Sequence, residues 1–383
     1  MDFSHVELSA EDQAFLEETR AFITKHVTDD VLRRQREFGE NFDEQVHLVL
    51  GEAGYLASDW KLESEGGFSA VRRRIFHLEI ARAHTPWYHW GTTSVVARLV
   101  QQFGAPELAG KVVPGVLSGE IRLCLGYTEP EGGSDVATCK TRAVRDDDTW
   151  IINGSKMFTS NAQNARYVFL LTNTDPQGPK HKNLTMFLVP LDSPGIEIQG
   201  IRTLDGDRTN IVYYSDVRVD DLYRIGEVNG GWTVMRAALD SEHGLVDRDE
   251  HGLQYLAAMG AHGDVMAEVV DTVAGIVGPA ADESVKYRLG RSVARVEAAL
   301  STPGMFGRVA VAQTMRDISA DVMDIEGTAS ALPADAHGCI GEGAAEHLYR
   351  LALPLGIYGG TLEVFRNMIA QHELKLGRPS YPG

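Results

Sequence analysis

Cysteine is scarce in this chain of 383 residues. Cys124, Cys139 and Cys339 lie far apart, so the sequence has neither a disulfide framework nor a CxxC metal or redox motif. This usage predicts a cytoplasmic protein with reduced thiols. The 13 histidines are scattered without an H-x-x-H or H-E-x-x-H pattern, so we also expect no metal site.

Basic residues are outnumbered, with 36 Lys and Arg against 54 Asp and Glu, and the formal net charge is −18. A nucleic-acid-binding protein normally carries a basic face, so this balance argues against that class. No stretch approaches the roughly 18 consecutive apolar residues that a membrane-spanning helix needs. The beginning of the chain is acidic and amphipathic and does not resemble a secretory signal. We therefore expect neither a nucleic-acid partner nor a membrane span.

The pattern of apolar residues changes twice along the chain. Up to residue 120 they recur at helical spacing. Residues 121–228 contain short β-branched and aromatic runs separated by turn residues, and residues 229–383 are again rich in helix-forming residues. We therefore predict an α+β protein with three domains: an N-terminal α-helical domain (1–120), a middle antiparallel β-domain (121–228) and a C-terminal helical domain (229–383).

Individual strands can be predicted within the middle domain. The expected strands are Tyr167–Thr172, Thr185–Val189, Ile196–Ile201 and Ile211–Val219. A further strand over residues 150–152 is followed by Asn153-Gly154, the strongest short signal for a hairpin turn. We therefore expect a turn at this dipeptide and a return strand over residues 156–159.

The segment Leu125–Asp135 departs from the pattern of a structural scaffold. Gly132 and Gly133 allow the backbone to approach a ligand closely, and Thr128 and Ser134 contribute hydroxyl groups. Such a loop could hold a flat ring with polar edges or a phosphate group. The alternative is an ordinary turn between a helix and a sheet.

This segment resembles the T-E-P-x-x-G-S-D signature of the acyl-CoA dehydrogenase family. Residues 153–160 are similar to the family's N-G-x-K stretch, residues 231–243 to the helix after its β-domain, and residues 359–370 to its C-terminal motif. Because the four matches occur in the family's order and span most of the chain, the chain is identified as a member. The resemblance implies the family's fold, with a C-terminal four-helix bundle, and FAD bound between the β-domain and the C-terminal helices.

The resemblance also assigns cofactor-binding roles to individual residues. Thr128 would bond the pyrimidine side of the flavin, Phe158 would lie against the ring, and Thr159 would bond near N5. Tyr127 and Gly133 would lie along the ring or its ribityl chain. The remaining assignments are Ser134 to the flavin phosphate or the pantetheine arm of the substrate, and Thr361 and Glu363 to flavin and adenosine groups.

The catalytic base of many family members is missing from its usual place. Those members carry a glutamate in a Y-E-G-T loop, whereas this chain has Gly359, which cannot accept a proton. Other members place the base on the helix after the β-domain, and that match falls on Glu242, beside His243. The resemblance therefore implies that Glu242 is the base; the alternative is a solvated helix glutamate. Gly359 and Gly360 would leave room for substrate near the acyl α-carbon.

The adenosine half of the family's FAD site is poorly matched. Residues 287–291 lack the Phe-Gly pair of the corresponding stretch, and Glu326 stands in the place of a glycine-rich loop. Anion sites favour backbone N–H groups and positive charge. The pattern resembles the heteromeric acyl-CoA dehydrogenases of actinobacterial steroid breakdown, in which two related subunits form each flavin site. We therefore expect an α2β2 complex with a paralogous subunit, or alternatively self-association with a variant adenosine site.

The reaction implied by the resemblance is α,β-dehydrogenation of an acyl-CoA thioester to the 2-enoyl-CoA. The relocated base predicts a branched or steroid-derived acyl group, and an electron-transfer flavoprotein would receive the electrons. Two alternatives stay open. The chain could be a non-catalytic partner subunit of a heteromeric dehydrogenase, or it could be a flavin monooxygenase built on the same fold.

Overall fold

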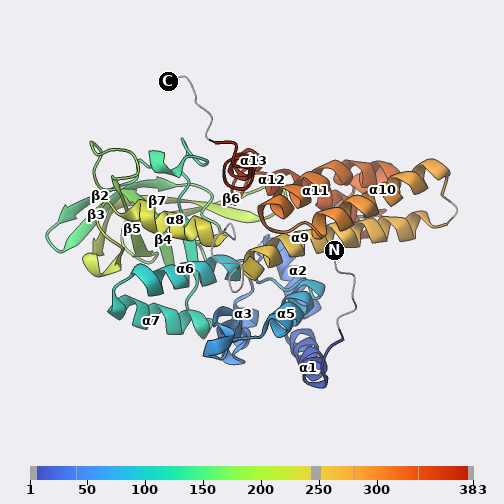
Figure 1. The fold of residues 1–383 in the computed structure, drawn as a ribbon, viewed down its shortest axis with the longest axis horizontal. Coiled ribbons are helices and arrows are strands. Elements are labelled where there is room, and N and C mark those ends of the chain that lie inside the picture. Colours follow the sequence, from blue (N-terminus) through green and yellow to red (C-terminus); the bar gives the residue numbers. More distant parts are fainter. Residues whose placement is uncertain (1–6, 40, 243–251, 280, 335, 378–383) are drawn as a thin grey trace. The chain divides into compact units, whose positions relative to one another are not determined.

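The computed structural model describes residues 7–39, 41–242, 252–279, 281–334 and 336–377; side chains of residues 240–261 lie outside the description. The chain forms two compact units (Figure 1). Unit 1 extends to Arg202 and includes Asp207–Leu239, and unit 2 consists of Thr203–Gly206 and the chain from Asp240 onward. Among the described residues, no helix is long and apolar enough to cross a membrane.

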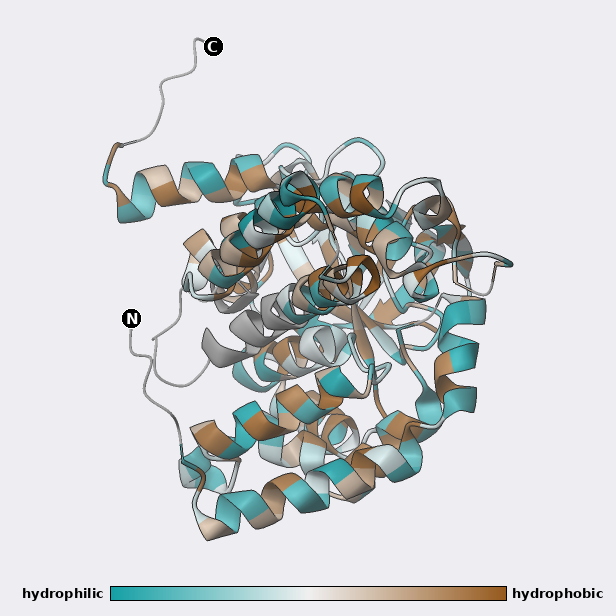
Figure 2. Ribbon diagram, turned by 90° about the vertical axis from the view of Figure 1, so that its right-hand side faces the viewer, coloured by the Kyte–Doolittle hydropathy of each residue, from teal (hydrophilic) through white to brown (hydrophobic). Residues whose placement is uncertain are grey.

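The described part of unit 1 begins with α-helices that bury one face each. Ser9 caps the first helix by accepting a hydrogen bond of 3.1 Å from the Asp12 N–H. Leu56, Phe76 and Val96 are completely buried in the shared core. Most helices in Figure 2 carry both hydrophobic and hydrophilic residues, as expected for helices with one buried face. The helices are α1 (Ala10–His26), α2 (Asp29–Phe38), α3 (Glu44–Glu52), α4 (Tyr55–Trp60), α5 (Ala70–Arg82), α6 (Trp90–Phe103) and α7 (Pro106–Leu117).

The remainder of unit 1 is a sheet with the strand order β6-β7-β3-β2-β4-β5-β8, in which β1 also pairs with β4. Neighbouring strands are antiparallel except β1 and β2, which both pair with β4 in parallel. The central strands β4 and β5 are buried on both faces, which explains their continuous apolar sequences. The strands are β1 (Leu123–Gly126), β2 (Arg142–Asp146), β3 (Thr149–Lys156), β4 (Tyr167–Asn173), β5 (Leu184–Pro190), β6 (Ile196–Arg202), β7 (Arg208–Asp220) and β8 (Arg224–Ile225).

The hairpin turn predicted at Asn153-Gly154 is wrong. Both residues lie inside β3, and the pairing of β3 with β7 shifts register between Ile152 and Gly154. Gly154 has a φ of +145°, and a Cβ atom there would lie 2.7 Å from the Thr141 Cα atom. The glycine therefore serves a β-bulge and a close backbone approach, while the turn between β2 and β3 falls at residues 147–148.

The helix α8 (Gly231–Glu242) follows the sheet. A Cβ atom at Gly231 would lie 2.8 Å from the Leu184 carbonyl, so glycine permits the start of α8 to meet β5. Val234, Met235 and Ala238 are buried in the same core as Leu184. This packing anchors the part of α8 that belongs to unit 1.

Unit 2 is helical, and α9, α10, α11 and α12 contact one another as a four-helix bundle. Val311, Met315, Ile318 and Val322 line the buried face of α11 at helical spacing. The helices are α9 (Gly252–Val277), α10 (Glu283–Leu300), α11 (Gly304–Glu326), α12 (Ala344–Leu355) and α13 (Leu362–Met368). The predicted sequence of N-terminal helices, middle sheet and C-terminal helices is thus confirmed.

Candidate functional site

The loop after β1 folds back on itself through a pair of hydrogen bonds. The Glu129 and Gly132 backbones each donate to the other's carbonyl oxygen at 3.1 Å. This turn brings Gly133 close to Thr128: a Cβ atom at Gly133 would lie 3.5 Å from the Thr128 Cγ2 atom. Ser134 follows and is exposed. The structure therefore brings together the predicted residues Thr128, Gly133 and Ser134 in one compact loop.

A second predicted segment lies against this loop. The Met157 N–H donates to the Thr128 carbonyl oxygen at 2.8 Å, which places the start of the segment 157–159 beside the loop. Phe158 has a left-handed backbone with a φ of +59°, and 55% of its surface is exposed. A left-handed conformation is uncommon for an aromatic residue and marks a position that its surroundings hold in place. The exposed ring is available to a planar ligand.

Thr159 is completely buried, in contrast to Phe158. Its N–H donates to the Asn210 carbonyl at 2.9 Å, and the Asn210 side chain returns a bond of 2.9 Å to the Thr159 carbonyl. No described residue provides a hydrogen-bond partner for the Thr159 hydroxyl. A buried hydroxyl without a partner costs free energy, so this position suits a ligand that supplies one.

A buried ion pair beneath the loop was not predicted from the sequence. The Lys156 side chain is fully buried, and its Nζ donates to Glu129 Oε1 at 2.7 Å. The same ammonium group contacts the Tyr127 carbonyl at 3.2 Å and Cys139 Sγ at 3.3 Å. Glu129 and Lys156 both occur within the two quoted motifs, but their charges alone do not reveal that they meet.

The surroundings of Glu129 keep its carboxylate ionised. Burial by itself raises the pKa of Glu129, but the Lys156 ammonium and backbone N–H donors outweigh it and lower the pKa to about 2. These donors are the N–H groups of Thr141 at 2.9 Å and Lys140 at 2.7 Å. Burial raises the pKa of the nearby Cys139 thiol to about 11, so the thiol stays protonated at neutral pH. The cluster is therefore suited to fixing the loop rather than to transferring protons.

Tyr127 is half-buried, and its ring packs edge-on against Phe169 with centroids 6.2 Å apart. Its carbonyl oxygen is held by Lys156, as described above. The ion pair thus contacts Tyr127 directly, while Thr128 precedes Glu129 in the loop and Phe158 and Thr159 follow shortly after Lys156.

The other predicted residues belong to unit 2. Gly359 and Gly360 have φ values of +62° and +96°, a conformation in which glycine is unstrained. Thr361 caps α13, because its hydroxyl accepts a hydrogen bond of 3.3 Å from the Val364 N–H. Glu363 is exposed in the first turn of α13, 3.8 Å from Arg366. Thr361 thus has a structural role as the N-cap of α13, in addition to the cofactor contact predicted from the sequence.

The predicted base lies at the limit of what the structure describes. Glu242 is the last residue of α8, and its side chain lies outside the described part. His243 falls outside the described residues altogether.

The stretches that correspond to the family's adenosine-binding segments, and match them poorly, make contacts within unit 2. Arg288 pairs with Asp321 at 3.1 Å and with Asp324 at 2.8 Å, and Arg291 also pairs with Asp321. Both carboxylate oxygens of Glu326 are buried without a hydrogen-bond partner among the described residues, and burial raises the pKa of Glu326. The positive charges of this region are therefore already compensated by carboxylates of the same chain.

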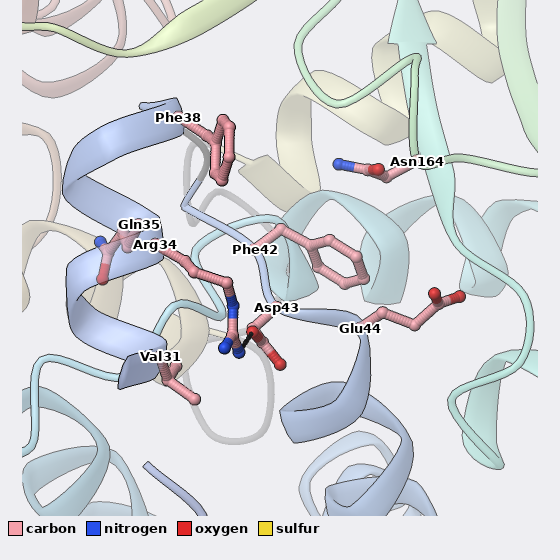
Figure 3. A pocket seen from close by; sticks show the side chains of 8 residues that line it. All are labelled: Val31, Arg34, Gln35, Phe38, Phe42, Asp43, Glu44 and Asn164. Atoms are coloured by element: carbon pink, nitrogen blue, oxygen red, sulfur yellow. Dashed lines mark hydrogen bonds and ion pairs between the residues drawn. The ribbon is translucent and has the colours of Figure 1, made fainter. Parts of the chain in front are cut away.

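A hollow of about 200 Å³ in unit 1 lies away from these residues (Figure 3). It borders α2 and the beginning of α3, and the ion pair between Arg34 and Asp43, 2.6 Å long, crosses its wall. None of the residues predicted from the sequence lines it. Among the described residues, no group of three or more His, Cys, Asp or Glu side chains could hold a metal ion.

Comparison with known proteins agrees with this architecture. The family model for the acyl-CoA dehydrogenase N-terminal domain matches residues 9–120, and the model for the middle domain matches residues 124–221. The chain is 30% identical over 367 residues to the acyl-CoA dehydrogenase FadE26 of Mycobacterium tuberculosis, covering 90% of each chain. It is 31% identical over 354 residues to the acyl-CoA dehydrogenase IpdE1 of Mycolicibacterium smegmatis, covering 86% of this chain and 87% of that one.

Two solved structures are also similar over almost the whole chain. The Tcur3481-Tcur3483 steroid ACAD, an acyl-CoA dehydrogenase, matches with a TM-score of 0.83 and 30% identity, covering 99% of this chain and 100% of that one. The ChsE4-ChsE5 complex from Mycobacterium tuberculosis matches with a TM-score of 0.80 and 27% identity, covering 98% and 100%. Together with the sequence relatives, these matches confirm the resemblance. The chain belongs to the acyl-CoA dehydrogenase family and is an oxidoreductase of that kind.

Proposed function

We propose that this chain is an FAD-dependent acyl-CoA dehydrogenase subunit that forms a 2-enoyl-CoA from a branched or steroid-derived acyl-CoA. Members of the family typically depend on FAD. The observation that carries the proposal is the loop of unit 1, in which the exposed Phe158 ring, the Thr128 loop and the unpartnered Thr159 hydroxyl occur together. This combination of a flat apolar surface and polar edge groups fits a flavin ring.

The residues of unit 1 would hold the ring in complementary ways. Phe158 would pack against its plane, and the Thr159 hydroxyl and the Thr128 loop would hydrogen-bond its edge. Gly133 and Ser134, both exposed, would leave space for the ribityl and phosphate groups. From unit 2, Thr361 and Glu363 are proposed as further contacts. FAD, when bound, supplies the acceptor for the hydride that leaves the substrate's β-carbon.

Glu242 is proposed as the base that removes the proton from the substrate's α-carbon. The position that many relatives use is Gly359, which has no side chain to accept a proton. The α-proton of a thioester is a weak acid, so the carbonyl oxygen must be stabilised by hydrogen bonds as negative charge develops. A base in an apolar setting has a raised pKa and accepts the proton more readily. Gly359 and Gly360 would widen the space around the acyl chain for a bulky group.

The relatives support the substrate class and the assembly. The Tcur3481-Tcur3483 protein is a steroid acyl-CoA dehydrogenase, and the ChsE4-ChsE5 protein is a complex of two named chains. The arginines of α10 already pair with aspartates, so they are poor ligands for a pyrophosphate. The buried carboxyl group of Glu326 is also a poor ligand for an anion. We therefore propose that a paralogous subunit supplies the adenosine-binding groups and that an electron-transfer flavoprotein accepts the electrons.

The variant E242Q tests the assignment of the base. It removes the proton acceptor while preserving size and polarity, so the rate of dehydrogenation should fall by about a hundredfold or more with FAD content unchanged. The rate would be measured as substrate-dependent flavin bleaching in a single turnover, with branched and steroid-derived acyl-CoA thioesters. The matched control is E283Q, at an exposed glutamate in the first turn of α10, which should react like the wild type.

The outcome also decides between the open alternatives. Full activity of E242Q within the complex would mean that the chain is a non-catalytic partner subunit. Oxygen consumption coupled to the substrate, without an enoyl product, would instead identify a flavin monooxygenase.

A further inference from the structure

Among the residues whose side chains the structure describes, Arg308 of α11 is the largest that is buried almost completely, with 1% of its surface exposed. No carboxylate pairs with it in the part of the chain that the structure describes, although its charge is costly to bury without compensation. Its Nε and Nη1 atoms also have no hydrogen-bond partner among the described residues. Packing alone does not account for a buried charged side chain, since an apolar side chain would fill the same space without this cost.

The hydrogen bonds of Arg308 are made at the C-terminal end of α12 and in the residues that follow it. Its Nη2 atom donates to the carbonyl oxygens of Leu355 at 2.7 Å and Tyr358 at 2.8 Å. Leu355 is the last residue of α12, where carbonyl groups have no partner within the helix and the helix dipole is negative. The guanidinium group therefore compensates its charge by capping the C-terminal end of a helix.

The same guanidinium group also reaches the far side of the loop that follows α12. Its Cζ atom lies 5.4 Å from the centre of the Phe365 ring of α13, a cation–π contact. The Phe365 ring in turn packs on Gly360, because a Cβ atom there would lie 3.0 Å from Phe365 Cε2. We call residues 356–361 the double-glycine loop. Arg308 thus contacts the residue before this loop, Tyr358 within it, and Phe365 in the helix that follows it.

Other bonds restrict the loop around this anchor. The Leu362 N–H donates to the Gly356 carbonyl at 3.1 Å, and the Ile357 N–H to the Pro354 carbonyl at 2.8 Å. The Tyr358 hydroxyl lies 2.9 Å from His262 Nε2 of α9. Two successive glycines with positive φ would otherwise leave the loop many conformations, since glycine loses more backbone freedom than any other residue on ordering.

We propose that Arg308 is a positioning residue, which holds the double-glycine loop in the one conformation that lets Gly359 and Gly360 accommodate the acyl group. This inference rests on the proposed function of the loop as part of the substrate site. Arg308 itself touches no reacting atom; it acts through the Tyr358 carbonyl and the Phe365 ring. A small displacement of residues that position a substrate can cost up to about a hundredfold in rate.

The test compares R308M and R308K in the holoenzyme, together with any partner subunit it requires. R308M removes the donors and the charge but retains a long apolar side chain, whereas R308K returns a cation that can reach the two carbonyls. We expect R308M to lower the rate of substrate-dependent flavin reduction by about ten- to a hundredfold and to raise KM for acyl-CoA. R308K should recover most of this loss. The control R295M removes an arginine whose partner is Asp317 on the surface of the bundle and should leave both constants unchanged.

Amide hydrogen exchange provides a readout that does not depend on the reaction. In R308M the amides of Ile357, Tyr358 and Leu362 should exchange faster, while those of α10 remain protected. Wild-type exchange at these amides in R308M would overturn the inference, as would a variant that loses only thermal stability and keeps wild-type kcat and KM. If R308M does not fold, R308K alone decides. Amide exchange in the double-glycine loop of R308K at the wild-type rate, together with complete loss of activity, would overturn the inference, because the loop would then be held in place without restoring the reaction. A wild-type protein that dehydrogenates no acyl-CoA would refute the proposed function, and the exchange data would still decide whether Arg308 anchors the loop.

Discussion

Lys156 and Glu129 carry opposite charges in a place where water is excluded. Taking each ion out of water is costly, and their mutual attraction, the two N–H donors to Glu129 and the contacts of the ammonium group offset that cost. Removing only one partner leaves the other charge buried and alone. The pair therefore stabilises unit 1 only as a pair, and it ties the carbonyl of Tyr127 to the last residue of β3.

The variant K156M should lower the free energy of unfolding by about 3–5 kcal/mol, because it leaves the Glu129 carboxylate buried without its cation. Denaturant titration measures this difference. The control K140M removes a lysine that is largely exposed and 3.9 Å from Glu131, which should change stability by less than about 1 kcal/mol. The double variant E129Q/K156M should be less destabilised than the sum of its single variants, and strict additivity would contradict the buried pair.

Two buried groups predict how stability changes with acidity. Burial of the His47 ring, assisted by the nearby Arg122, lowers the pKa of His47 from 6.5 to about 4. Because the unfolded chain then binds the proton more readily, stability is lost as the pH falls from 6.5 toward 4. The pKa of Glu129 is lowered from 4.5 to about 2, so its contribution is present above 4.5 and is lost between 4.5 and 2.

The variant H47F should remove the loss of stability that His47 causes as the pH falls from 6.5 toward 4. Between pH 7 and 4 the wild type should lose roughly 3 kcal/mol more stability than H47F, as follows from the size of the shift. Urea titrations at a series of pH values measure it. The control H337Q alters an exposed histidine and should follow the wild-type profile. Parallel profiles for H47F and wild type would show that His47 is not buried in its neutral form.

At the scale of elements, strand pairing unites motifs that are distant in the sequence. Strand β1 ends at Gly126 and β3 ends at Lys156, and the residues that follow each strand meet through the bond from the Met157 N–H to the Thr128 carbonyl. The bulge at Gly154 lies two residues before Lys156 and allows β3 to approach Thr141. The position of residues 157–159 thus depends on one irregular strand.

The variant G154A should therefore destabilise unit 1 by at least about 1–3 kcal/mol, since alanine is strained at this φ and its Cβ would meet backbone atoms. The midpoint temperature of thermal unfolding and the amount of FAD retained should both be lower in G154A than in the wild type. The control G110A places a methyl group in open space on α7 and should raise stability by about 0.5–1 kcal/mol. Equal effects of the two substitutions would refute the role of the bulge.

At the scale of the whole molecule, unit 2 contains the stretches that correspond to the family's adenosine-binding segments. The arginines of α10 are neutralised by aspartates of α11, and unit 2 also contains the buried carboxyl group of Glu326. A pyrophosphate would have to compete with these carboxylates for each arginine. This arrangement favours a partner subunit as the source of the missing groups.

The chain purified alone should therefore contain much less than one FAD per chain, and co-expression with a paralogous acyl-CoA dehydrogenase subunit should restore the full content. Flavin absorbance measures the content, and light scattering measures the mass expected for an α2β2 complex. A stoichiometric FAD load in the chain alone would refute the shared site and favour self-association with a variant adenosine site.

The sequence by itself was sufficient for the order of the domains, for most strands and for the family, because apolar periodicity and short motifs are local properties. Phe158 and Thr159 could be proposed as cofactor-binding residues from a motif, but the left-handed φ of Phe158 and the unpartnered hydroxyl of Thr159 could not be predicted from it. The hairpin at Asn153-Gly154 was predicted wrongly because the local turn signal is identical to that of a bulge. Only the approach of Thr141, distant in the chain, distinguishes the two.

Tertiary structure alone decided which polar groups meet. Glu129 and Lys156 are 27 residues apart, Arg308 and Leu355 are 47 apart, and nothing in the local sequence relates either pair. Burial then sets their energetics, because the same charges that water would screen at the surface become costly unless they are paired inside. Composition and motif thus determine the class of chemistry, whereas packing determines which residues hold the loops in place.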